Sequence, residues 1–299
     1  MDNSIVKYQK AYSKIINRLK SNEDVLATMV FGSMVTGDLW KESDIDLFVI
    51  IDEIMDSMKN VYTEDEEKVP VHVKVMSKKE LKRICEEELR GGKMHRIFSS
   101  SRLVFSKDKQ ITAWYDGCRY YPDMDKERWN LVYLGNVFKN AGVCKKYLKS
   151  KTIYTAYSAC ISTLEEFSKL CINYSGYMIS KDVITMSTNL DDDLKKIVDE
   201  LFLEKEDLYG AINNLLDYIG RYINKNISNI CNVLISYLKE KDKLLSSEEI
   251  LEDDFFSSYN INMEEILKCL SEKNIIKRDS RKLNTDNGKW IFKENVYFV

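Results

Sequence analysis

The sequence is poor in proline: only Pro70 and Pro122 occur among 299 residues, whereas average usage is about 5%. This scarcity favours long uninterrupted helices and argues against a proline-rich linker. The seven cysteines are scattered and form no Cys-x-x-Cys pair. Neither a disulfide framework nor a zinc site is therefore indicated.

The sequence also lacks an apolar run near the ~18 residues that a membrane span needs. Its first twenty residues are charged and amphipathic, without the apolar centre of a secretory leader. Lysine and arginine (45) nearly balance aspartate and glutamate (48), so the net charge of −3 argues against a general polyanion binder. We expect a cytoplasmic, reduced, soluble protein without a membrane partner.

The first third of the chain has the pattern of a small mixed α/β domain, residues 1–118. Apolar residues recur at three- and four-residue steps between Ile5 and Leu19, which predicts a helix. Short apolar or β-branched runs predict strands, and a charged amphipathic stretch predicts a further helix. The predicted strands are Val25–Phe31, Asp44–Ile51, Val69–Met76 and Arg102–Phe105, and the further helix is Lys78–Arg90.

The predicted secondary structure changes twice in the rest of the chain, at residues 119 and 243. The fold class predicted for the whole chain is α+β. Residues 119–242 show only helical periodicity, which predicts an all-α bundle. Its predicted helices are Lys126–Lys149, Ile153–Asn173, Leu194–Leu203, Asp207–Asn224 and Ile227–Lys239. Residues 243–299 begin with a capping-box spacing at Ser246–Glu249. A helix over Asn262–Asn274 and a hairpin about Asp286-Asn287-Gly288 follow, so this last domain is predicted to be winged-helix-like.

The informative chemistry lies where two predicted strands begin and end. Asp44 and Asp46 are two residues apart at the start of a strand, so both carboxylates emerge on one face. Two adjacent like charges repel unless a cation neutralises them, and paired hard oxygen ligands suit Mg²⁺ together with substrate phosphates. Gly32 lets a phosphate approach the backbone closely, and Ser33 offers a hydroxyl and an N–H to an anion.

Gly32-Ser33, ten further residues and then Asp44-x-Asp46 resemble the signature of the polymerase-β-like nucleotidyltransferases, which include the aminoglycoside nucleotidyltransferases. The α/β unit followed by a helical bundle resembles the kanamycin-nucleotidyltransferase type. The three-part arrangement resembles nucleotidyltransferase-like proteins of low-GC bacteria. The resemblance implies Mg²⁺-dependent transfer of a nucleoside monophosphate from a nucleoside triphosphate to an acceptor hydroxyl. Asp44 and Asp46 would hold the metal, and Gly32 and Ser33 would bind the nucleotide.

The family pattern calls for a third acid on a neighbouring strand, and Val69–Met76 has none. If its odd-numbered valines face the core, His72 and Lys74 face the side where that acid belongs. His72 could ligate a metal or accept a proton, and Lys74 could replace part of the cation's charge; alternatively, both lie at the sheet surface. Glu66 and Glu67 are substitutes for the acid or members of a solvated acidic loop. The alternative function is a catalytically inactive nucleotide-binding or regulatory protein on the same fold, whose C-terminal unit binds a partner or DNA.

Three further sequence patterns are weaker indications of function. Arg90-x4-His95 matches a pattern of helical ribonucleases, but it crosses a Gly-Gly helix stop and is interpreted as coincidence. Tyr154, Tyr157, Tyr174 and Tyr177 could stack a base or form an amphipathic core. The C-terminal hairpin carries Lys277, Arg278, Arg281, Lys282, Lys289 and Lys293, which would suit a phosphate backbone. The preceding helix carries Glu264, Glu265 and Glu272, so a nucleic-acid partner is not favoured.

Overall fold

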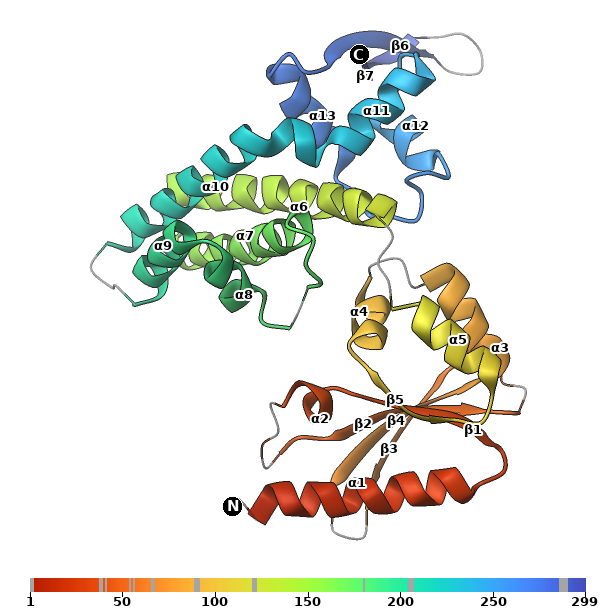
Figure 1. Ribbon diagram of the computed structural model, residues 1–299. Coiled ribbons are helices and arrows are strands. Elements are labelled where there is room, and N and C mark those ends of the chain that lie inside the picture. The colour runs from red at the N-terminus through yellow and green to blue at the C-terminus, as the bar shows by residue number, and fades with distance from the viewer. Residues whose placement is uncertain are drawn as a thin grey trace. The chain divides into compact units, whose positions relative to one another are not determined.

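The computed structural model describes residues 3–37, 40, 42–53, 55, 57–65, 68–88, 92–119, 123–179, 181–203, 207–284 and 290–299 (Figure 1). The chain divides into two compact units, Met1–Pro122 and Asp123–Val299. The first unit holds a five-stranded sheet, and the second is mainly helical. The predicted α+β fold class is thereby confirmed.

The sheet of the first unit has the order β3-β4-β2-β1-β5. Its strands are β1 (Val25–Phe31), β2 (Ile45–Ile51), β3 (Lys59–Glu64), β4 (Pro70–Ser77) and β5 (Arg102–Ser106). Strand β1 is antiparallel to β2 and β5, and β3 is antiparallel to β4. The two central strands β2 and β4 are parallel, which brings the start of β4 beside the start of β2.

Each face of this sheet has its own apolar cluster, because side chains alternate along a strand. Ile45, Leu47 and Val49 pack with α1 (Asn3–Ser21) on one face. Phe48 and Ile50 face the opposite side, which is covered by the segments between β4 and β5 and after β5. These segments are α3 (Lys78–Arg83), the π-helical turn η1 (Ile84–Glu88), α4 (Lys93–Ser99) and α5 (Lys109–Gly117). Figure 1 shows α1 on one side of the sheet and α3, α4 and α5 on the other.

The four predicted strands are present, with ends shifted by one residue at most. Strand β3 was not predicted, because all six of its residues are exposed and it has no buried face to create a pattern. The prediction of one continuous α-helix over 78–90 was wrong. Ser77 caps α3, which ends at Arg83 and passes into η1, while residues 89–91 lie outside the described part.

The second unit is built on helices with one shared core. They are α6 (Asp123–Lys149), α7 (Ile153–Tyr174), α8 (Val183–Leu190), α9 (Asp192–Leu203), α10 (Leu208–Ile230), α11 (Asn232–Lys241), α12 (Ser247–Glu252) and α13 (Met263–Glu272). Helix α8 was not predicted. The break predicted between two helices at residues 225–226 is also wrong. Helix α10 continues to Ile230, and the break between α10 and α11 comes at Cys231.

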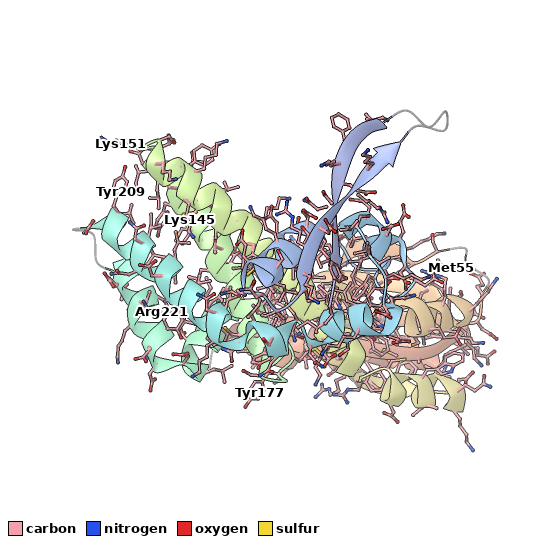
Figure 2. All side chains as sticks on the ribbon, turned by 90° about the horizontal axis from the view of Figure 1, so that it is seen from above. Met55, Lys145, Lys151, Tyr177, Tyr209 and Arg221 are labelled. Carbon is pink, nitrogen blue, oxygen red and sulfur yellow. The ribbon has the colours of Figure 1, made fainter. Side chains whose placement is uncertain are left out.

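The C-terminal segment contributes buried residues to this same core, among them Ile266, Leu270 and Tyr297. Ser246 and Glu249 form the predicted capping box. Strands β6 (Lys277–Asn284) and β7 (Trp290–Phe298) form the predicted hairpin, which projects from the helices of its unit in Figure 2. Its turn lies outside the described residues.

Leu245, between α11 and α12, forms an isolated antiparallel bridge with Tyr297 of β7. After α10 the chain therefore runs through α11, this bridge, α12, α13 and the β6–β7 hairpin. The division into domains 119–242 and 243–299 stays a prediction. Within the described chain, no helix is both long and apolar enough to cross a bilayer.

Candidate active site

The two halves of the predicted motif meet at Gly32. Strand β1 ends at Phe31, and Gly32 has φ +72° and ψ −152° before the short helix α2 (Ser33–Thr36) begins. Only glycine adopts this backbone conformation without strain. A Cβ atom at Gly32 would lie 2.3 Å from Oδ2 of Asp46. The missing side chain therefore makes the space that the Asp46 carboxylate fills.

Asp46 lies at the start of β2, where three strands run side by side. In register, it pairs with Phe31 of β1 and with His72 of β4. Nδ1 of His72 is 3.0 Å from Oδ1 of Asp46, and the two side chains are 15% and 21% exposed. The structure thus places His72 on β4 directly beside Asp46, on the strand that carries no acid.

Asp44 precedes β2 by one residue and is exposed. The Tyr8 hydroxyl of α1 donates to the backbone carbonyl of the adjacent Ser43 at 2.5 Å, which ties this stretch to the first helix. Burial raises the pKa of Tyr8, and the negative charges of Asp44 and Glu42 raise it further. The tyrosine therefore stays protonated and keeps its role as a donor.

The far edge of the His72 ring is held by β3, the strand that the sequence did not predict. Nε2 of His72 is 3.3 Å from Oδ1 of Asn60, and Nζ of Lys74 donates to the same oxygen at 2.8 Å. The lysine ammonium can only donate, so the Asn60 atom that it contacts must be the amide oxygen, which accepts. Each ring nitrogen thus has an oxygen acceptor beside it, Oδ1 of Asp46 or Oδ1 of Asn60.

Tyr62 of β3 covers the imidazole. Its ring stacks on the His72 ring, with the centroids 4.5 Å apart and the planes at 5°. Tyr62 itself is 75% exposed. Asn60 and Tyr62 are site residues that the sequence analysis missed. The β-prone run Val61-Tyr62-Thr63 was the signal that could have revealed their strand.

The donor set fits a hard divalent cation that also binds substrate oxygens. Asp44 and Asp46 supply carboxylate oxygens two residues apart, as Mg²⁺ prefers when phosphates and water complete its shell. Among the residues that the structure describes, no group of three His, Cys, Asp or Glu side chains could hold a metal. Glu66 and Glu67 lie outside the described residues.

The other predicted candidates lie apart from this cluster. His95 is fully buried in α4, and Arg90 lies outside the described part. Tyr157 and Tyr174 pack against the core of the second unit, whereas Tyr154 and Tyr177 are exposed (Figure 2 labels Tyr177).

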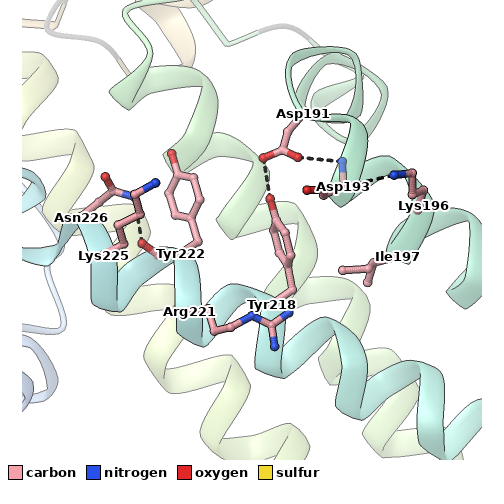
Figure 3. Close-up of a pocket in the computed structure, with 9 residues that line it drawn as sticks. All are labelled: Asp191, Asp193, Lys196, Ile197, Tyr218, Arg221, Tyr222, Lys225 and Asn226. Atoms are coloured by element: carbon pink, nitrogen blue, oxygen red, sulfur yellow. Dashed lines mark hydrogen bonds and ion pairs between the residues drawn. The ribbon is translucent and has the colours of Figure 1, made fainter.

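The second unit has a hollow of its own of about 530 Å³, shown in Figure 3. Residues of α9 and α10 line most of it, and the Tyr218 hydroxyl donates to Asp191 there at 2.5 Å. None of the predicted motif residues lines it. In the basic hairpin, Arg281 is paired with Glu249 and Glu294.

Comparison with known proteins agrees with this geometry. Residues 13–110 match the family model described as polymerase beta, nucleotidyltransferase. That segment contains Gly32, Ser33, Asp44, Asp46 and His72. The first unit is therefore a nucleotidyltransferase-type domain. The match of this segment confirms the resemblance to the polymerase-β-like nucleotidyltransferases that Gly32-Ser33 and Asp44-x-Asp46 carry.

The fold is shared with a solved structure, and a second one aligns more weakly. A nucleotidyltransferase-like protein from Exiguobacterium sibiricum 255-15 aligns with a TM-score of 0.67 at 14% identity, covering 97% of this chain and 99% of that one. A spectinomycin adenyltransferase from Enterococcus faecialis, crystallised with ATP and spectinomycin, aligns with a TM-score of 0.32 at 12% identity over 74% of this chain and 100% of that one. No curated protein matches the chain.

Proposed function

We propose that this protein transfers a nucleoside monophosphate from a nucleoside triphosphate to an acceptor hydroxyl, with Mg²⁺ bound at Asp44 and Asp46. The observation that carries the proposal is the position of Asp46. Its carboxylate lies against the Gly32 backbone on one side and His72 on the other. Gly32 and Asp46, separated in the sequence, therefore lie against each other, and Asp44 precedes the same strand by one residue.

Each motif residue has a separate task in this proposal. Mg²⁺, when bound, offsets the charge on the transferring phosphorus and on the leaving pyrophosphate. Asp44 and Asp46 hold the ion, and the bare backbone at Gly32 leaves room for a phosphate. Ser33, directly after the turn, offers its hydroxyl and N–H to phosphate oxygens.

His72 acts as a positioning residue in this proposal. It donates from Nδ1 to Asp46 Oδ1 and is itself held by Asn60 and by the stacked Tyr62. A carboxylate fixed in one orientation presents its remaining lone pairs to the ion without having to reorganise.

A second candidate function is a non-catalytic nucleotide-binding or regulatory protein. The observation that favours it is the same His72. A histidine occupies the strand position beside Asp46, and no third acid joins the pair among the described residues. Nucleotide binding would then persist, while transfer would be lost with the missing acid.

The test combines binding and turnover on the full chain. Calorimetry measures the affinity for a non-hydrolysable triphosphate with Mg²⁺ and with chelator, in the wild type and in Asp44→Asn. We expect each ligand to bind weakly alone and both to bind together. Incorporation of labelled nucleotide into an acceptor then supports the transferase, whereas metal-dependent binding without transfer supports the regulatory alternative. Tight binding in chelator that Asp44→Asn leaves unchanged would overturn the metal site at Asp44 and Asp46, and with it the proposed transferase.

A further inference from the structure

The hollow beside α9 and α10 in the second unit has the size and the lining of a ligand site (Figure 3). Its volume of about 530 Å³ lies within the range of about 300–1,000 Å³ that is typical of small-molecule sites. Five of its lining residues lie at positions i, i+3, i+4, i+7 and i+8 of α10, which is one face of that helix. They are Tyr218, Arg221, Tyr222, Lys225 and Asn226.

Two cations of this lining have no partner. The side chains of Arg221 and Lys225 form no hydrogen bond or ion pair with any residue that the structure describes. They are four residues apart on α10, where Cβ atoms lie about 5–6 Å from each other, so both cations can reach one bound group. Arginine offers a planar fork of N–H donors and lysine a point charge, and both suit phosphate oxygens.

The two acids of the lining are already bonded within the protein. Asp191 accepts from the Tyr218 hydroxyl at 2.5 Å. It also accepts from the backbone N–H groups of Asp193 and Leu194 at the start of α9. Asp193 is itself paired with Lys196 at 3.2 Å. The unpaired charge of the hollow is therefore positive, which favours an anionic ligand.

The wall beside the cations is aromatic and fixed in place. Tyr218 and Tyr222 both meet the buried ring of Phe167 on α7 edge to face, with ring centroids 6.1 and 5.1 Å away. Ile197 of α9 adds an apolar side chain and faces Tyr218 in Figure 3. A ligand held by the cations would thus lay an apolar body against side chains that need little further ordering.

We propose that this hollow binds a small phosphate monoester with a flat apolar body. Arg221 and Lys225 hold the phosphate, and Tyr218, Tyr222 and Ile197 contact the body. A phosphate monoester carries a charge of about −1.5 to −2 at neutral pH, which matches two unpaired cations better than the single charge of a carboxylate does. The proposal is independent of the reaction proposed for the first unit.

The test measures binding of phenyl phosphate to the full chain by calorimetry, in the presence of chelator. Inorganic phosphate lacks the apolar body and benzoate carries one negative charge, so we expect both to bind more weakly. Arg221→Gln should weaken phenyl phosphate about tenfold, because it removes hydrogen bonds between charged groups. Lys195 is exposed on α9 and does not line the hollow, so Lys195→Gln removes the same charge and provides the matched control.

Arg221 and Lys225 are both exposed, so thermal melting should show that their variants stay folded. No binding of phenyl phosphate, or binding that Arg221→Gln and Lys225→Gln leave unchanged, would overturn the proposal. So would benzoate or inorganic phosphate that binds as tightly as phenyl phosphate. The Mg²⁺-dependent binding of triphosphate should be the same in Arg221→Gln as in the wild type. If it falls too, Arg221 belongs to the nucleotide site and a separate phosphate site is wrong.

Discussion

Gly32 and Asp46 are complementary in shape: a Cβ atom at Gly32 would lie 2.3 Å from Oδ2 of Asp46. Gly32→Ala should therefore damage the site in two ways. The positive φ strains any other residue by about 1–3 kcal/mol, and the new methyl group displaces the carboxylate. We expect the affinity for Mg²⁺ with triphosphate to fall at least about tenfold, since ~1.4 kcal/mol is a factor of ten. Calorimetry and thermal melting measure the two effects.

Gly37 provides the matched control. It also has a positive φ, +85°, but an added Cβ would meet nothing within 4 Å. Gly37→Ala should cost stability through backbone strain alone and leave nucleotide affinity nearly unchanged. Equal losses of affinity in both variants would show that strain of the turn, rather than contact with Asp46, governs the site.

His72→Asp should install the acid that β4 lacks, because His72 pairs with Asp46 in register and contacts it. Without metal, two adjacent carboxylates repel, so the melting temperature should fall. With Mg²⁺ and triphosphate, a third hard ligand should raise the affinity severalfold. The two opposite shifts are measured by melting the variant with and without ligand.

The control is His72→Asn, which keeps a polar side chain without adding charge and should not bind metal more tightly. Lys74→Asp should help less than His72→Asp, because in register Lys74 pairs with Phe48, whereas His72 pairs with Asp46. If His72→Asp stays folded and its Mg²⁺ affinity does not rise, His72 is not at the third-acid position.

The motif could be predicted because its parts follow short apolar runs. The end of Val25–Phe31 and the start of Ile45–Ile51 place Gly32 and Asp46 within a few residues of visible boundaries. Alternation likewise predicted that His72 and Lys74 share a face. Which of them meets Asp46 depends on the register of two parallel strands. That register is a long-range property with no signal in either strand.

Strand β3 shows the other limit. Its residues are all exposed, so no burial pattern distinguishes it from a loop, and Asn60 and Tyr62 were missed with it. Similarly, nothing in the sequence near residues 224–226 prevents helix continuation, and α10 runs on until its chain turns at Cys231. Patterns of burial predict elements only where one face is buried.

Asp253 should make the second unit sensitive to acid. A hydrogen bond from Lys241, with others from the Phe255 N–H and the Tyr237 hydroxyl, lowers its pKa to about 2. A lowered folded pKa stabilises the fold above the unfolded value of about 3.9, and this contribution is lost as the pH falls from about 4 through 2. Asp253→Asn should cost about 1 kcal/mol at pH 7. The cost should vanish near pH 2.

Asp254→Asn removes the same charge from the exposed neighbouring residue and serves as the control. Denaturant unfolding of the three proteins at pH 7 and near pH 2 measures the differences. A cost of Asp253→Asn that is equal at both pH values would contradict the role of the carboxylate.

Helix α6 packs closely against the start of α13 at Gly135. A Cβ atom at Gly135 would lie 3.0 Å from the Cβ and 3.1 Å from the backbone nitrogen of Asn262, the residue that precedes α13. Backbone atoms cannot swing aside as a long side chain can, and the Asn262 amide is also bonded to Asn136 at 2.8 Å. Gly135→Ala gains about 1 kcal/mol of helix propensity but should lose more to the clash, since overpacking costs roughly 1–3 kcal/mol.

Gly142 lies in the same helix, is exposed, and would meet nothing within 4 Å. Gly142→Ala should therefore stabilise the second unit by up to about 1 kcal/mol through helix propensity alone. Because both substitutions add one methyl group to α6, their difference in unfolding free energy isolates the contact with Asn262. Denaturant unfolding measures it, and equal stabilisation by both variants would mean that α6 does not approach Asn262 as closely as the structure shows.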